Sequence, residues 1–168
     1  MSVLAAAGKQ SPENSKAAGM LSHAVIGGIV LGCVDILFAW LFWRSKGVTV
    51  TDVFQSIARG VYGKQAAVLG NTSVAVGAAC HFFIAVCMVL AWIEFVSFKP
   101  AFNRHWVAWG ALYGLLLYVF MNFVVLPITP VGWPKFGNPE WIEASVFMHL
   151  LFGIWCGYCG SRYLARRH

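Results

Sequence analysis

The sequence predicts an all-α polytopic membrane protein, a bundle of four transmembrane helices. Of its 168 residues, 60% are hydrophobic and only 11% are charged, and the mean hydropathy is +0.71. A soluble domain carries about 25% charged residues, so this chain has too few charges to cover its surface in water. Four stretches are mostly apolar over the roughly 20 residues that a helix needs to cross a bilayer. They are residues 21–43, 73–96, 106–126 and 141–163.

The four stretches leave little chain for any other domain. We expect a polar, disordered N-terminal tail over residues 1–20, a transmembrane domain over 21–163 and a basic C-terminal tail over 164–168. The N-terminal tail is too polar for a secretory signal, and the first stretch ends without the small residues of a cleavage site. The first stretch is therefore expected to stay in the protein as a transmembrane helix.

The positive charges indicate how the chain is oriented. The net charge is +6, and the Lys and Arg residues lie near the span ends, where they contact anionic lipid headgroups. This placement gives no indication of nucleic-acid binding. Seven of them lie on the side of the termini and the second loop, and five on the side of the first and third loops. The excess predicts that both termini are cytoplasmic. We call the opposite end, formed by residues 44–72 and 127–140, the loop end.

Both long loops lie at the loop end. The first begins with a possible helix N-cap at Thr51, and its apolar residues then recur at helical spacing. This pattern predicts a short amphipathic helix, either lying in the membrane interface or packed on the bundle. The third loop holds four of the six prolines. Because proline blocks helix formation, we expect a stiff, extended segment there.

Four polar residues inside the spans form a candidate site: Asp35, His81, Asn122 and His149. Three of them, Asp35, His81 and His149, are each eight residues from the loop end of their span. That spacing puts each one about 12 Å inside the membrane boundary. Asn122 is four residues from its span end, so it lies about 6 Å deep. Polar side chains in lipid are costly, so a shared depth on different helices suggests one cluster.

Small residues occupy the same helix faces as these polar residues. Such residues allow helix backbones to approach closely in a membrane. The expected packing residues are Gly28, Gly32, Gly77, Gly110, Gly114, Gly153, Gly157 and Gly160. They could join helices within one chain or join two copies of the chain as a homo-oligomer.

The cluster has three interpretations. It could be a network of hydrogen bonds between helices. It could instead hold haem b between His81 and His149, or a metal ion bound by these histidines together with Asp35. Finally, it could carry protons or a small solute, as ionisable groups inside a bundle often do. The residue pattern leaves all three open.

A pair of cysteines, Cys156 and Cys159, has the spacing of thiol oxidoreductases. Reactive thiolates of such pairs usually lie at a helix N-terminus, whereas this pair lies near the C-terminal end of the fourth span. We therefore interpret both as packing residues. The sequence contains no glycine-rich phosphate loop, nucleophile elbow or HExxH motif, so we do not expect an enzyme.

Several segments are similar to the YagU-like family of small bacterial inner-membrane proteins. They are "GGIVLGCVDILFAW", "VFQSIARGVYGKQAAVLG", "GAACHFFIA", "GALYGLLLYVFMNFVVLP" and "FMHLLFGIWCG". The similarity extends over most of the chain after residue 20. It implies four helices in the bacterial cytoplasmic membrane, and it supplies no reaction and no substrate. The sequence therefore predicts an integral inner-membrane protein with the lipid bilayer as its partner and with no assigned role.

Overall fold

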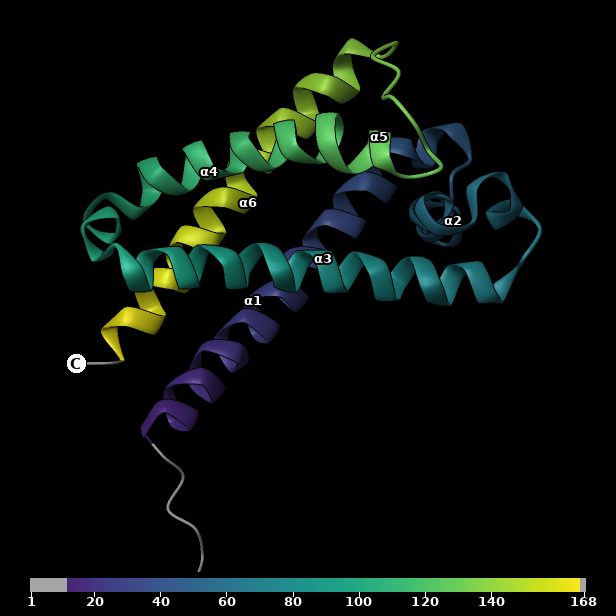
Figure 1. Ribbon diagram of the computed structural model, residues 1–168. Helices are drawn as coiled ribbons and strands as arrows, with labels where there is room; N and C mark the ends of the chain where they lie inside the picture. Colours follow the sequence, from purple (N-terminus) through teal and green to yellow (C-terminus); the bar gives the residue numbers. More distant parts are fainter. Residues whose placement is uncertain (1–11, 167–168) are drawn as a thin grey trace, which may run out of the picture.

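The computed structural model describes residues 12–166, which are mostly helical and contain no strand. The helices, in chain order, are α1 (Pro12–Trp43), α2 (Val50–Tyr62), α3 (Asn71–Phe98), α4 (Trp106–Phe120), α5 (Leu126–Ile128) and α6 (Pro139–Ala165) (Figure 1). Four segments are long and apolar enough to cross a membrane: α1, α3, α6 and the stretch that contains α4 and α5. The expected bundle of four membrane-spanning helices is confirmed.

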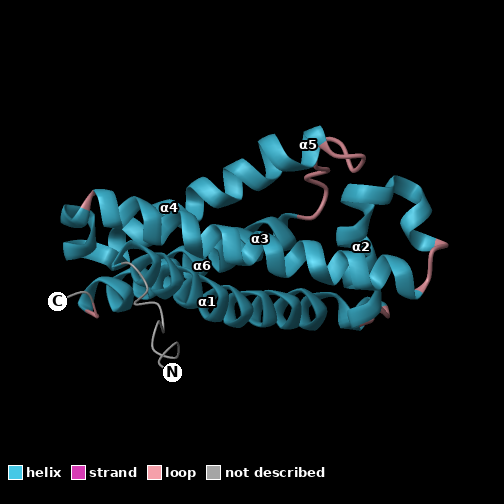
Figure 2. Ribbon diagram, turned by 60° about the horizontal axis from the view of Figure 1, so that its bottom comes forward, coloured by secondary structure: helices cyan, strands magenta, loops and turns pink. Residues whose placement is uncertain are grey.

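The bundle is built from two helix pairs. Helix α1 packs along α3, helix α4 packs along α6, and contacts of α6 with α1 and α3 join the two pairs. The beginning of α1 and the end of α6 lie at one end of the molecule, whereas α2 and α5 lie at the other (Figures 1 and 2). A core of buried side chains from α1, α3 and α6 fills the half nearest the termini, and its fully buried members include Val89, Ile93, Val96 and Cys156.

Backbone contact at glycines holds the second pair together. A Cβ atom added to Gly110 would lie 2.6 Å from the carbonyl oxygen of Gly153. One added to Gly114 would collide with the carbonyl group of His149, and one added to Gly153 would collide with the backbone of α4. Because real Cβ atoms do not approach backbone atoms so closely, only glycine allows α4 and α6 to cross here.

The remaining expected packing glycines also lie at contacts within the chain. Gly28 faces the backbone of Val86 and Gly32 faces the ring of Phe82, so both lie between α1 and α3. The other three contact α2, α4 and α3: they are Gly77, Gly157 and Gly160, respectively. All eight glycines are buried. The structure thus places each of them between helices of a single chain.

Aromatic side chains form hydrogen bonds between helices of the bundle. The Tyr113 hydroxyl of α4 donates to the Met88 carbonyl of α3 at 2.8 Å, and the Trp155 indole of α6 donates to the Gly27 carbonyl of α1 at 2.9 Å. Both side chains were overlooked in the sequence, because aromatic residues are frequent in membrane spans. They satisfy their polar atoms while packing their rings against neighbouring helices.

Helix α1 begins at Pro12, nine residues before the expected span. Residues 12–20 are helical, so the expectation of a disordered tail is wrong for them, and residues 1–11 lie outside the described part. Pro12 and Glu13 suit a first helical turn, since proline needs no N–H there and a carboxylate favours the positive end of the helix dipole. The Tyr163 ring also packs edge-on against His23, with 5.6 Å between ring centroids. Helix α6 likewise continues two residues into the expected C-terminal tail.

The amphipathic helix of the first loop is α2, and it packs on the bundle. Its N-cap is Thr49 and not Thr51: the Thr49 side chain accepts a hydrogen bond from the Asp52 backbone, and the Asp52 carboxylate accepts from the Thr49 backbone. The Thr49 hydroxyl also donates to the Asp52 carboxylate at 2.6 Å. This bond and, to a smaller extent, the bond from the Thr49 backbone N–H lower the pKa of the exposed Asp52 carboxyl. The helix lies across α3, with the carbonyl group of Phe54 against Gly77.

The third span contains a wider helical turn. Helix α4 ends at Phe120, Met121–Val125 form a π-helical turn, and α5 then continues to Ile128, two residues beyond the expected end. Pro127 lacks the N–H that a regular helix would use at this position. Turns of the π type occur often at functional sites, and this one contains Asn122.

Gly153→Ala should destabilise the bundle, because the added methyl group would meet the backbone of α4. Such overpacking costs about 1–3 kcal/mol. Gly19→Ala in α1 is the matched control, since a Cβ at Gly19 meets nothing within 4 Å; it should leave stability unchanged or raise it by up to about 1 kcal/mol. Unfolding in mixed detergent micelles, followed by circular dichroism, measures both. Equal stability of the two variants would contradict the close crossing of α4 and α6.

Candidate functional site

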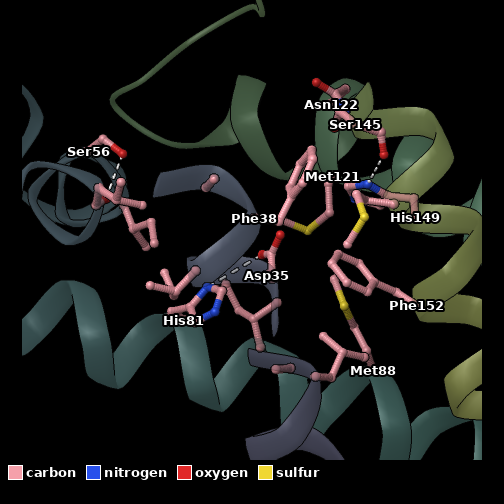
Figure 3. Close-up of a pocket in the computed structure, with 18 of the residues that line it drawn as sticks. Asp35, Phe38, Ser56, His81, Met88, Met121, Asn122, Ser145, His149 and Phe152 are labelled. Atoms are coloured by element: carbon pink, nitrogen blue, oxygen red, sulfur yellow. Dashed lines mark hydrogen bonds and ion pairs between the residues drawn. The ribbon is translucent and has the colours of Figure 1, made fainter. Parts of the chain in front are cut away.

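All four polar residues of the candidate site line one cavity between the helices (Figure 3). Its volume is about 280 Å³. Asp35 comes from α1, His81 from α3, Asn122 from the π-helical turn after α4, and His149 from α6. The sequence placed these residues at similar depths, and the structure brings them together around a single hollow space. We call this space the inner cavity.

The Asp35 carboxylate points into the middle of the inner cavity (Figure 3). Its side chain keeps 35% of its surface accessible although the residue lies well inside a membrane-spanning helix. Its nearest ionisable partner is His81, whose Nδ1 lies 4.0 Å from Oδ2. Within residues 12–166 no hydrogen bond reaches this carboxylate. His149 lies on the opposite wall of the cavity (Figure 3). Asp35 therefore presents unoccupied oxygen atoms to whatever fills the cavity.

His81 joins two helices with one ring nitrogen and faces Asp35 with the other. Its Nε2 lies 3.0 Å from the carbonyl oxygen of Gly32 in α1. A carbonyl can only accept, so Nε2 carries the hydrogen, and in neutral imidazole Nδ1 is then a bare acceptor. Bare Nδ1 and the Asp35 carboxylate are two acceptors facing each other, and one added proton on either group turns this contact into an attraction. A single proton shared by the Asp35–His81 pair would remove this repulsion.

His149 uses its ring nitrogens in the opposite way. Its Nδ1 lies 2.8 Å from the Ser145 carbonyl oxygen one turn earlier in α6, so Nδ1 carries the hydrogen. That leaves Nε2 as an acceptor without a hydrogen-bond partner among the described residues. The ring of Tyr118 packs edge-on against the imidazole at 5.3 Å between centroids. His149 thus offers a second proton acceptor on the far side of the cavity from His81.

These hydrogen bonds bear on the three interpretations of the cluster. Only His81 bonds to another helix, since His149 bonds within α6 and the Asn122 amide donates to the Tyr118 carbonyl at 2.9 Å within its own helical segment. A network between helices would need more such bonds. In His81 the Nε2 atom already donates to Gly32, so only Nδ1, which faces Asp35, is free to bind an iron atom. In residues 12–166 no group of three or more His, Cys, Asp or Glu side chains could hold a metal ion. The arrangement fits proton or solute binding best.

The rest of the inner cavity is mainly apolar, and the sequence did not single out these side chains. They include Phe38, Met88, Met121, Trp141, Met148 and Phe152, and helix α2 adds Val53, Ser56 and Ile57. The helical spacing of apolar residues in α2 signalled a buried face, but it did not show what that face would cover. Thioether side chains are flexible and polarisable, so this wall can adapt to the shape of an apolar ligand.

A second, more polar cavity of about 400 Å³ adjoins the first at the loop end. We call it the vestibule. It is lined by Arg59 of α2 and Lys135 of the third loop, among others. The two cavities share four lining residues, namely Asn122, Leu126, Trp141 and Ser145. The inner cavity and the vestibule therefore meet at these four residues.

The inner cavity is closed toward the termini. Leu31, Ala85 and Phe152 line it and are buried, and the core of α1, α3 and α6 continues directly beyond them. Cys156 and Cys159 belong to this core and line neither cavity; both are buried free thiols. The site is therefore a pocket that is closed toward the termini and adjoins the vestibule at the loop end.

Comparison of the chain with models of known protein families, with characterised proteins and with solved structures gives no match. The similarity to the YagU-like family thus stays a prediction, and the functional argument depends on the geometry of the site.

The two cavity histidines should have opposite neutral tautomers. His81 should carry its hydrogen on Nε2 and His149 on Nδ1, because each of these atoms lies within hydrogen-bond distance of a backbone carbonyl. Nitrogen-15 NMR of the histidine-labelled protein at alkaline pH measures this directly, with His81→Asn and His149→Asn to assign the signals. The same tautomer at both positions would contradict the arrangement.

Proposed function

We propose that this chain is an integral inner-membrane protein that binds a small solute in the inner cavity and couples this binding to the binding of a proton at the same cavity. One observation carries the proposal: the accessible Asp35 carboxylate lies between two imidazoles whose free ring nitrogens are acceptors. Ionisable residues inside membrane spans are costly and usually mark a solute or proton pathway. Here three of them converge on a space that can hold a ligand.

The proton has a defined place in this proposal. Protonation of the Asp35–His81 pair removes the repulsion between its two facing acceptors, and a second proton can bind Nε2 of His149. A ligand that enters the cavity meets a site whose charge depends on these groups, so ligand binding and proton binding are coupled by linkage. The blind inner end gives no continuous path through the molecule. Transport would therefore require a second conformation in which α6 moves away from α1 and α3.

We also propose the membrane and the orientation. The similarity to the YagU-like family supports the bacterial cytoplasmic membrane. The excess of Lys and Arg on the side of the termini supports cytoplasmic termini. The loop end and the vestibule then face the periplasm, and a solute would enter from that side.

Infrared spectroscopy of the protein in nanodiscs tests the proton site. On acidification a carboxylic-acid C=O band from Asp35 should appear, and it should shift quickly in heavy water because the cavity is accessible. Asp35→Asn should remove this band, and His81→Asn should change the pH at which it appears. Glu94→Gln is the control, since Glu94 is an exposed carboxylate on α3 that lines neither cavity. A spectrum that Asp35→Asn leaves unchanged would overturn the proton role of Asp35.

Reporter fusions test the orientation. Alkaline phosphatase inserted after Gly47, in the exposed turn between α1 and α2, should be active, whereas the same enzyme fused after the C-terminus should be inactive. Green fluorescent protein at the C-terminus should fluoresce. The reverse pattern would place the vestibule on the cytoplasmic side.

A further inference from the structure

We propose that the vestibule and the inner cavity together bind a single-chain amphipathic carboxylate. Its carboxylate would lie between Arg59 and Lys135, and its apolar chain would extend into the inner cavity. This inference rests on the proposed function, which supplies an accessible ligand site, and adds the chemical class of the ligand.

The vestibule has an excess of positive charge. Arg59 and Lys135 line it, and no Asp or Glu in the described part of the chain does. Within residues 12–166 neither cation forms a salt bridge, since the one pair found there joins His81 and Asp35. A guanidinium group binds a carboxylate through two parallel hydrogen bonds, and an ammonium group adds a second positive charge. An anionic headgroup therefore matches this cavity.

The inner cavity matches one short apolar chain. Its walls beyond the shared residues are largely apolar and include Met88, Met148 and Phe152, and they close toward the termini. Its volume of about 280 Å³ leaves room for a short alkyl chain.

A cationic ligand is disfavoured by the same geometry. Asp35 is the single carboxylate that lines the inner cavity in residues 12–166, and His81 and His149 already interact with it. A cation would also have to pass the two positive charges of the vestibule. Glu140 and Glu143 lie nearby in sequence, at the start of α6, but neither lines a cavity. The carboxylate of the ligand thus belongs in the vestibule, and Asp35 remains the proton site.

Binding of radiolabelled octanoate to the purified protein in phosphatidylcholine nanodiscs tests the inference. Octanol and octylammonium, which have the same chain with a neutral or positive headgroup, serve as competitors. Unlabelled octanoate should displace the radiolabelled octanoate at a concentration at least tenfold lower than either analogue needs. Arg59→Gln and Lys135→Gln should each weaken octanoate binding about tenfold. Lys64→Gln, which removes an exposed charge at the loop end that lines neither cavity, should leave it unchanged.

The outcomes separate the two proposals. Equal effects of Lys64→Gln and Arg59→Gln would mean adsorption to a basic surface and would overturn the vestibule site. In a contrary outcome, octylammonium displaces the radiolabel better than octanoate does, and it loses this advantage in Asp35→Asn. That result would overturn the carboxylate headgroup of the ligand but would still support a solute in the inner cavity. Displacement of octanoate by phosphatidylglycerol in the nanodisc would assign the vestibule to a lipid headgroup and overturn the single-chain ligand. Failure of octanoate to bind, with the Asp35 infrared band intact, would overturn only this inference.

Discussion

The close approach of helix backbones at glycines is the constraint on which the rest of the structure depends. Each cavity histidine lies at a glycine contact between helices. Gly32 of α1 leaves room for the rings of Phe82 and His81 of α3, and its carbonyl receives the hydrogen bond of His81. Gly114 lets α6 approach α4 at the backbone of His149 itself. The contacts that hold the two helix pairs together therefore also fix the positions of the two proton acceptors.

The cavity exists because these contacts are not continued toward the loop end. There α4 and α5 rise away from α3 (Figure 2), and the π-helical turn widens the third span where it reaches Asn122. Helix α2 closes the gap from the side, held against Gly77 by its own backbone. Because the helices pack closely in one half and are farther apart in the other, the bundle has a solid core near the termini and a cavity near the loops.

Much of this could be predicted from the sequence, for reasons that particular residues illustrate. The four spans could be predicted because long apolar stretches must cross the bilayer. The inward direction of Asp35 and His81 could be predicted because each shares a helix face with glycines, which pack against other helices. Local hydrogen bonding was not predictable in the same way. The spacing of His149 does not reveal that its nearest partner is the Ser145 carbonyl of its own helix. The role of Arg59 also depends on how α2 packs on α3, which a periodic pattern does not specify. The predicted start of α1 was wrong, because residues 12–20 are polar like a tail although they form the first turns of this helix.

The solid half of the bundle also determines where the membrane voltage acts on this protein. An electrical potential falls mainly across material of low dielectric constant, and here that material is the buried core from Leu31 and Phe152 to Tyr163. Moving one elementary charge through a full 100 mV costs about 2.3 kcal/mol. A proton that reaches Asp35 from the loop end does not cross this core, so it passes through only part of that potential difference.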